Sequence, residues 1–141
     1  MSNVKLGIRV RPFTEREFKS DKDRTRVVNI VDEHTVTITN VKVSISGAGD
    51  SRTRVRTYSA DYAFDSACSF TNPSYASQEK VYDTIGREVV EFVSRGSSAC
   101  VLAYGQSATG KTYTMMGPDT DPGLVPRICR ALATEQPLEI T

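Results

Sequence analysis

The 141-residue chain contains no tryptophan, one histidine and three cysteines. Because Cys68, Cys100 and Cys129 include no C-x-x-C pair, we expect neither a disulfide framework nor a tetrahedral zinc site, and a reducing compartment is the natural setting. His34 is the single imidazole around which any histidine-based catalytic site would have to be built. It lies among polar, turn-like residues and is not expected to be catalytic.

The sequence also lacks an excess of either charge and any long apolar run. The 18 basic and 17 acidic residues give a net charge of +1, so no nucleic-acid partner is expected. The longest apolar run, residues 99–104, is far shorter than the roughly 20 residues of a membrane-spanning helix, and the N-terminus has no signal-peptide pattern. We therefore expect no membrane insertion and a cytoplasmic location.

The first half of the sequence predicts short strands. Apolar and polar residues alternate from Val4 to Val10, a period typical of a half-buried strand, and Pro12 ends it. Residues 14–26 are charged and aperiodic, so a solvated loop or a frayed turn is expected there. A small β meander is expected over about residues 26–58, followed by a further strand over residues 58–64. The expected pieces of the meander are residues 26–30, 35–40 and 41–45.

The second half predicts helices around a buried strand. Apolar residues at spacings of three and four indicate a helix over residues 77–95, with Ser77 as N-cap and Gly96 after its end. Gly86 inside this helix is expected to weaken it by about 1 kcal/mol relative to alanine. Residues 99–104 are typical of a strand buried on both faces. The order of these elements predicts an α/β fold.

Residues 105–112 match the phosphate-binding pattern G-x-x-x-x-G-K-[ST] without a gap. Gly105 and Gly110 allow the backbone to fold into a concave nest of N–H groups that bind phosphate oxygens. Lys111 and Thr112 are the predicted catalytic residues, because the ammonium group neutralises the β- and γ-phosphates and the hydroxyl can ligate Mg²⁺. The alternative is a glycine-rich turn with a surface lysine. The predicted cofactor-binding residues of this loop are Gly105, Gln106, Ser107, Ala108, Thr109, Gly110, Lys111 and Thr112.

The sequence around this loop resembles the phosphate-loop signature of kinesin motor domains, A-Y-G-Q-T-x-[SA]-G-K-[ST]-x-T-M-x-G. Residues 104–117 read YGQSATGKTYTMMG, with Ser107 in the place of the usual threonine. Residues 8–12, IRVRP, are similar to the R-x-R-P that ends the family's first strand. Residues 75–78 and the pair Met115–Met116 resemble the third kinesin class, the vesicle carriers. The resemblance covers about residues 3–132.

This resemblance implies a P-loop NTPase fold of the kinesin motor type, with a mostly β central sheet flanked by helices. The chain would be its N-terminal portion, ending in an interrupted helix over about residues 111–133. The implied cofactors are ATP or ADP with Mg²⁺, and the implied partners are microtubules, which sets the chain on the cytoskeleton. The adenine is expected near Arg9, Arg11 and Pro12, with Tyr113 on its other side. The alternatives are solvated arginines on an edge strand and a packing role for Tyr113.

Two functions remain open from the sequence. The first is the ATP-binding part of a microtubule-based motor ATPase of the plus-end vesicle-transport type. The second is a non-catalytic nucleotide-binding or interaction fragment, because the N-x-x-S-S-R and D-x-x-G segments with which kinesins sense the γ-phosphate do not follow the loop. The family's microtubule-facing loops, its neck linker and the strand that separates its first and phosphate-loop strands are expected beyond residue 141. A different P-loop NTPase, such as a small kinase, would leave the R-x-R-P match unexplained.

Overall fold

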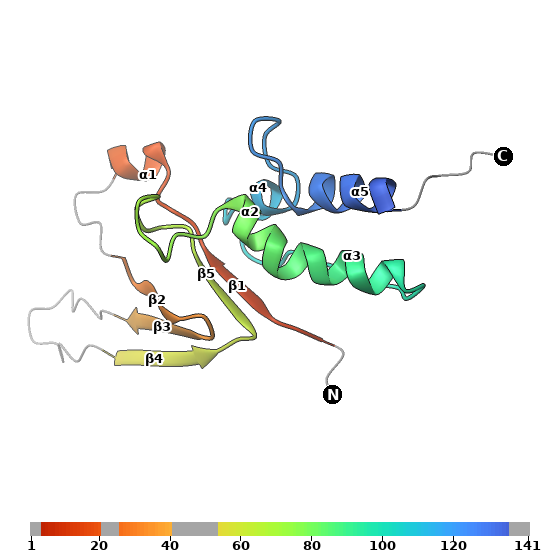
Figure 1. Ribbon diagram of the computed structural model, residues 1–141. Coiled ribbons are helices and arrows are strands. Elements are labelled where there is room, and N and C mark those ends of the chain that lie inside the picture. The colour runs from red at the N-terminus through yellow and green to blue at the C-terminus, as the bar shows by residue number, and fades with distance from the viewer. Residues whose placement is uncertain (1–3, 21–25, 41–53, 136–141) are drawn as a thin grey trace, which may run out of the picture. The chain divides into compact units, whose positions relative to one another are not determined.

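The computed structural model describes residues 4–20, 26–40 and 54–135 and divides into two compact units, Met1–Tyr75 and Ala76–Thr141. Each unit has its own elements and its own buried residues (Figure 1). The elements of the first unit are β1 (Gly7–Val10), α1 (Glu15–Ser20), β2 (Val28–Asp32), β3 (Thr35–Asn40), β4 (Arg54–Ser59) and β5 (Tyr62–Asp65). Those of the second are α2 (Gln78–Val81), the π-helical turn η1 (Tyr82–Gly86), α3 (Arg87–Ser94), α4 (Lys111–Met115) and α5 (Leu124–Glu135).

Two small sheets build the first unit. Strands β1 and β5 are parallel, with Gly7 opposite Tyr62 and Val10 opposite Asp65. Strands β2, β3 and β4 form an antiparallel sheet in that order, as Figure 1 shows. Val36 and Phe64 are 2% and 4% exposed and are the buried apolar residues of this unit among the residues described.

The prediction of one strand over residues 58–64 is wrong. The alternation of side chains continues through this stretch, but the chain changes partner at Ala60 and Asp61, where β4 ends and β5 begins. Ala60 N–H donates to the carbonyl of His34 in the turn between β2 and β3, and Asp61 N–H donates to that of Leu6 just before β1, so consecutive residues bond to different parts of the chain. The expected strand over residues 41–45 lies outside the described residues.

The expectation of a loop over residues 14–26 is also wrong in part, because α1 begins at Glu15. Two local devices start this helix. Thr14 Oγ1 accepts from the Glu17 N–H at 3.3 Å while Glu17 Oε2 accepts from the Thr14 N–H at 2.7 Å, which is a capping box. The rings of Phe13 and Phe18 then meet edge to face at 6.0 Å, as a hydrophobic staple does.

The helix predicted over residues 77–95 is present as the continuous series α2, η1 and α3. Ser77 is its N-cap, with its hydroxyl accepting from the Lys80 N–H at 3.1 Å, and Gly96 follows its end with φ 81°. Gly86 has a different role from the one expected. A Cβ on Gly86 would lie 2.3 Å from the ring of Tyr82, so this position accommodates a close-packed aromatic side chain at the π-helical turn.

Residues 99–104 are not the buried strand that their apolar run predicts. No strand is present over these residues, and Leu102 and Tyr104 are 84% and 96% exposed. A strand exists only as a member of a hydrogen-bonded ladder, and an apolar run specifies covered faces but not a partner.

The expected interrupted helix is present as α4 and α5, with a loop over residues 116–123 between them. The loop folds closely onto α4, because a Cβ on Gly123 would lie 2.6 Å from the carbonyl oxygen of Thr114. The buried apolar residues of this unit are Ala76 just before α2, Val81 in α2, Val90 in α3 and Leu124 in α5. Among the described residues no helix is long and apolar enough to cross a membrane.

Candidate nucleotide-binding site

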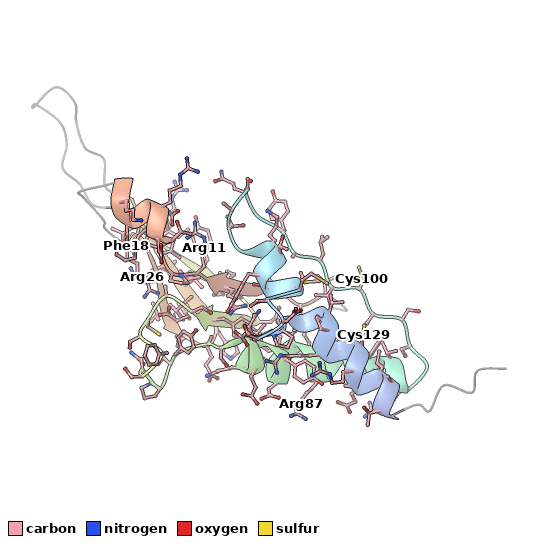
Figure 2. The ribbon with its side chains drawn as sticks, turned by 90° about the horizontal axis from the view of Figure 1, so that it is seen from above. Arg11, Phe18, Arg26, Arg87, Cys100 and Cys129 are labelled. Atoms are coloured by element: carbon pink, nitrogen blue, oxygen red, sulfur yellow. The ribbon has the colours of Figure 1, made fainter. Side chains whose placement is uncertain are left out.

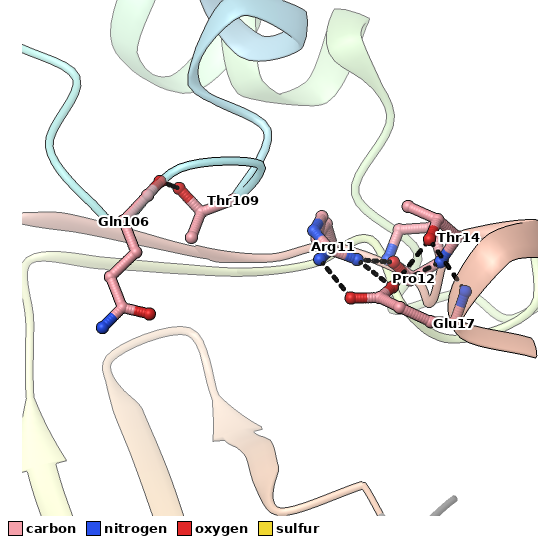
Figure 3. Close-up of polar contacts among 6 residues, drawn as sticks. All are labelled: Arg11, Pro12, Thr14, Glu17, Gln106 and Thr109. Atoms are coloured by element: carbon pink, nitrogen blue, oxygen red, sulfur yellow. Dashed lines mark hydrogen bonds and ion pairs between the residues drawn. The ribbon is translucent and has the colours of Figure 1, made fainter. Parts of the chain in front are cut away.

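The backbone of residues 105–112 turns back on itself through left-handed conformations. Ala108 and Gly110 have φ of 62° and 93°, and Gly105 has φ 149°. Alternation of right- and left-handed residues is the conformation that gathers successive N–H groups into an anion-binding concavity. Thr109 Oγ1 donates to the Gln106 carbonyl at 2.8 Å, which closes the turn (Figure 3). A Cβ on Gly105 would lie 2.7 Å from that same hydroxyl oxygen, so glycine is required there.

The side chain of Lys111 lies against this loop. Its Nζ donates to the carbonyl of Gly105 at 2.8 Å and to that of Gln106 at 2.6 Å. An ammonium group has three donors, so the two carbonyls hold the charge at the loop while one further bond remains to be made with an anion. Thr112 and Ser107 are exposed. The arrangement places a cation, a hydroxyl and a folded backbone within one eight-residue segment, as a polyphosphate site requires.

Tyr113, the residue expected beside the adenine, is held at both ends. Its hydroxyl donates to Asp121 Oδ2 at 2.9 Å, and its carbonyl accepts from Gln78 Nε2 at 2.6 Å. Asp121 also pairs with Arg127 at 3.4 Å. The Tyr113 residue is 45% exposed, so it is not a core aromatic. Gln78 is 2% exposed and holds the start of α2 to the backbone of α4.

Arg9 and Arg11 belong to the first unit, at the end of β1, and Pro12 follows them. They are half-buried and hydrogen-bonded, unlike the solvated arginines of the alternative hypothesis. Arg9 Nε donates to the hydroxyl of Ser66 at 2.8 Å, and Ser66 is itself buried. The two arginines alternate with Val10 and therefore project from the same face of β1.

Arg11 forms a two-pronged ion pair with Glu17. Its Nη1 donates to Oε2 at 2.9 Å and its Nη2 donates to Oε1 at 2.8 Å, while Nη1 also donates to the Pro12 carbonyl at 2.7 Å (Figure 3). The hydrogen bonds from Arg11 and from the Thr14 N–H lower the pKa of Glu17 to about 2. Glu17 is therefore ionised throughout the neutral range and holds the Arg11 guanidinium at two points.

Sequence reasoning missed Glu17 and Asp121. The signal for Glu17 was present, because Thr14 and Glu17 have the spacing of a capping box and Phe13 and Phe18 that of a hydrophobic staple. No comparable signal marks Asp121, since its partners Tyr113 and Arg127 come from two separate helices. The exposed Cys100 and Cys129 and the ion-paired Arg87 lie on the second unit and have no part in these arrangements (Figure 2).

The family model of the kinesin motor domain matches residues 9–137. The chain belongs to the kinesin motor domain family. Among curated relatives, the kinesin-like protein KIF16B is 46% identical in Mus musculus and 45% identical in Homo sapiens, each over 94% of this chain. Human KIF13B and KIF1C, at 36% and 35% identity, are further kinesin-like relatives. The chain spans about a tenth of the length of the KIF16B relatives that it matches.

Solved structures of kinesins share this fold. A KIF14 motor segment with ADP in complex with a microtubule is 31% identical, with a TM-score of 0.77. A KIF14 dimer with AMP-PNP in complex with a microtubule has a TM-score of 0.78 at the same identity. Each comparison covers 99% of this chain and 35% of the KIF14 chain. The chain therefore has part of the kinesin motor fold, and the prediction of that fold and family is confirmed.

Proposed function

We propose that this kinesin chain is the nucleotide-binding, N-terminal portion of a microtubule-based motor ATPase. The observation that carries the proposal is the folded loop of residues 105–112, with left-handed backbone at Ala108 and Gly110 and the Lys111 ammonium held against it. Such a loop suits the polyphosphate of ATP or ADP, because peptide N–H groups and one cation together neutralise several phosphate oxygens.

Each group of the loop has a distinct role in this proposal. Backbone N–H groups of residues 105–112 bind the α- and β-phosphates, and Lys111 exchanges a loop carbonyl for a phosphate oxygen. The exposed Thr112 hydroxyl would supply a ligand to Mg²⁺, whose charge would offset that of the phosphates. Among the described residues there is no group of three or more metal-ligating side chains. One protein hydroxyl nevertheless suffices for Mg²⁺, which takes its other ligands from phosphate and water.

The base would be held by the side chains that the family resemblance assigns to it. The proposal gives Arg9, Arg11 and Pro12, in the first unit, a contact with the base, and it separately gives the ring of Tyr113, in the second unit, the same kind of contact. Guanidinium groups and tyrosine rings both stack on aromatic bases. The hydrogen bonds of Arg11 and Tyr113 to carboxylates support such a role, because they use the edges of these groups and leave stacking to their faces.

The whole protein is proposed to act on microtubules, by analogy with the KIF14 structures, which are complexes with a microtubule. Vesicle transport is proposed from the resemblance of residues 75–78 and of Met115–Met116 to the third kinesin class. Hydrolysis by the 141 residues alone is expected to be slight, because no N-x-x-S-S-R or D-x-x-G segment follows the loop to orient the attacking water. The chain alone would then act as a nucleotide-binding module, which is the second candidate function.

The test is a titration of the 141-residue chain with a fluorescent ATP analogue and Mg²⁺. Lys111→Ala removes the only side-chain cation of the loop and is expected to weaken binding roughly 10- to 100-fold, the usual effect of losing charge-assisted hydrogen bonds. Unchanged binding by this variant would contradict the assignment of the site. Microtubule-stimulated phosphate release then separates the two candidate functions. Rapid microtubule-stimulated phosphate release by the 141-residue chain would exclude the second candidate function, a nucleotide-binding module that does not hydrolyse ATP.

A further inference from the structure

Gln78, the first residue of α2, has a buried side chain, although glutamine is polar and mostly exposed in proteins. It is 2% exposed. Its Nε2 donates to the carbonyl oxygen of Tyr113 at 2.6 Å and, more weakly, to that of Asp121 at 3.5 Å. Gly117 leaves room for this amide, because a Cβ there would lie 2.9 Å from Nε2. The amide therefore joins the start of α2 to the backbone of α4, 35 residues further along the chain.

The hydrogen bond from Gln78 supplies a donor that α4 does not provide for itself. In a continuing α-helix, the Tyr113 carbonyl would accept from the N–H of Gly117, four residues further on. That N–H donates instead to the carbonyl of Thr112 at 3.2 Å, where α4 ends. The last carbonyls of a helix need donors from elsewhere, and the Gln78 amide is one such donor.

The position of α4 matters because this helix carries two groups of the phosphate loop. Lys111 and Thr112 are its first two residues, and Gly110 before them provides no side-chain cap. A helix of five residues is far too short to be stable by itself, so its orientation depends on contacts with the rest of the unit. The carbonyl that Gln78 holds belongs to the residue directly after Thr112. A change in this contact should therefore be felt at the Lys111 ammonium and the Thr112 hydroxyl.

We infer that Gln78 is a positioning residue for phosphate binding, which fixes α4 and so holds Lys111 and Thr112 at the phosphate loop. This inference rests on the proposed function, since it assumes that the loop binds the phosphates of ATP or ADP. Gln78 acts through the backbone of Tyr113 and does not touch the ligand. All the residues that take part belong to the second unit.

The test measures the binding of inorganic triphosphate, which has the phosphate tail of ATP but no base. Its affinity for the 141-residue chain with Mg²⁺ is determined by titration calorimetry. Gln78→Met keeps the length and bulk of the side chain and removes the donor. Gln78→Asn keeps the amide but is one methylene shorter, so it does not reach the Tyr113 carbonyl. Each variant is expected to bind triphosphate about three- to tenfold more weakly, the equivalent of one net hydrogen bond.

Val90→Ala is the control for a general loss of stability. Val90 is 5% exposed in α3, outside α4 and the phosphate loop, so this substitution should lower the free energy of unfolding and leave the triphosphate affinity unchanged. In ¹H–¹⁵N spectra of the ligand-free chain, Gln78→Met should shift the N–H resonances of residues 105–112, and Val90→Ala should not. The same spectra show which variants are folded, and affinities are compared among those.

Lys111→Ala distinguishes a failure of this inference from a failure of the proposed function. If Lys111→Ala leaves triphosphate binding unchanged, the proposed function itself is wrong. If it weakens binding while either Gln78 variant binds as the parent chain does, the positioning role is wrong and the phosphate site stands. The positioning role is also wrong if Val90→Ala loses as much affinity as Gln78→Met, or if neither Gln78 variant folds, since the role of Gln78 is then one of stability.

Discussion

At the end of β1, side chains hold one another, whereas in residues 105–112 the backbone forms the site. Arg11 depends on Glu17, and Glu17 depends in turn on Thr14. The phosphate loop instead depends on backbone conformations at Gly105, Ala108 and Gly110. A backbone site demands particular residue types at fixed positions. A side-chain site demands only complementary partners, which many sequences provide.

This difference determines how each region responds to substitution. In the loop, a changed backbone conformation should affect every phosphate ligand. At the end of β1, a changed side chain should affect only ligands that carry a base. The predictions that follow test this separation.

The largest effect is expected from Gly110→Ala. Gly110 has φ 93°, and a residue with a Cβ in the left-handed region costs about 1–2 kcal/mol. Because the loop would relax away from its binding conformation, ATP and triphosphate should both bind about 5- to 30-fold more weakly by calorimetry.

Gly96 is the matched control for that substitution. It has φ 81° and no atom within 4 Å of the place that a Cβ would occupy, so Gly96→Ala carries similar strain outside the loop. Its cost should appear in the free energy of unfolding and leave both affinities unchanged. Equal losses of affinity in the two variants would contradict a local role for the loop backbone.

Tyr113 should give an intermediate effect that depends on its ring. Tyr113→Ala removes the stacking surface and is expected to weaken ATP binding about fivefold, near 1 kcal/mol, without changing triphosphate binding. Tyr113→Phe loses the bond to Asp121 but keeps the ring, so ATP affinity should change less than about twofold. A larger loss in Tyr113→Phe than in Tyr113→Ala would show that the hydroxyl, and not the ring, is the functional group.

The smallest effect concerns acid stability. The pKa of Glu17 is about 2 in the folded chain against 4.5 for an ordinary glutamate, so the unfolded chain takes up this proton first as the pH falls. The stabilisation from Glu17 is complete above about pH 5 and is lost progressively towards pH 2. In urea unfolding, Glu17→Gln should therefore differ from the parent chain at about pH 6 and converge with it only as the pH falls to about 2. Glu15→Gln should follow the parent throughout, and a constant difference at every pH would refute the ion pair.

The sequence was most informative where the backbone carries the structure. The turn of residues 105–112 could be predicted because its glycines permit left-handed backbone conformations. The helix capped by Ser77 could be predicted because a capping serine and periodic apolar residues are local signals of a helix. The close approach of Tyr82 to Gly86 could not be predicted in the same way, because it depends on a π-helical turn that helix propensities do not describe.

Partnerships between distant residues could not be predicted in this way. Residues 99–104 have the composition of a buried strand, but composition does not specify which strand would pair with them. In the structure Leu102 is 84% exposed. Residues 58–64 alternate without interruption although β4 and β5 bond to different strands. The pairing of Arg11 with Glu17 joins a strand end to the helix that follows it, and it becomes evident only once α1 is in place.

The most direct test of the central claim is the response of the backbone N–H groups of residues 105–112 to a phosphate ligand. In ¹H–¹⁵N spectra of the labelled chain, Mg²⁺ with ADP and Mg²⁺ with inorganic triphosphate should both shift these resonances. Of the two ligands, only ADP should also shift the side-chain resonance of Arg11. If neither ligand moves the signals of residues 105–112 at concentrations that saturate the Lys111-dependent binding, the loop is not the phosphate site.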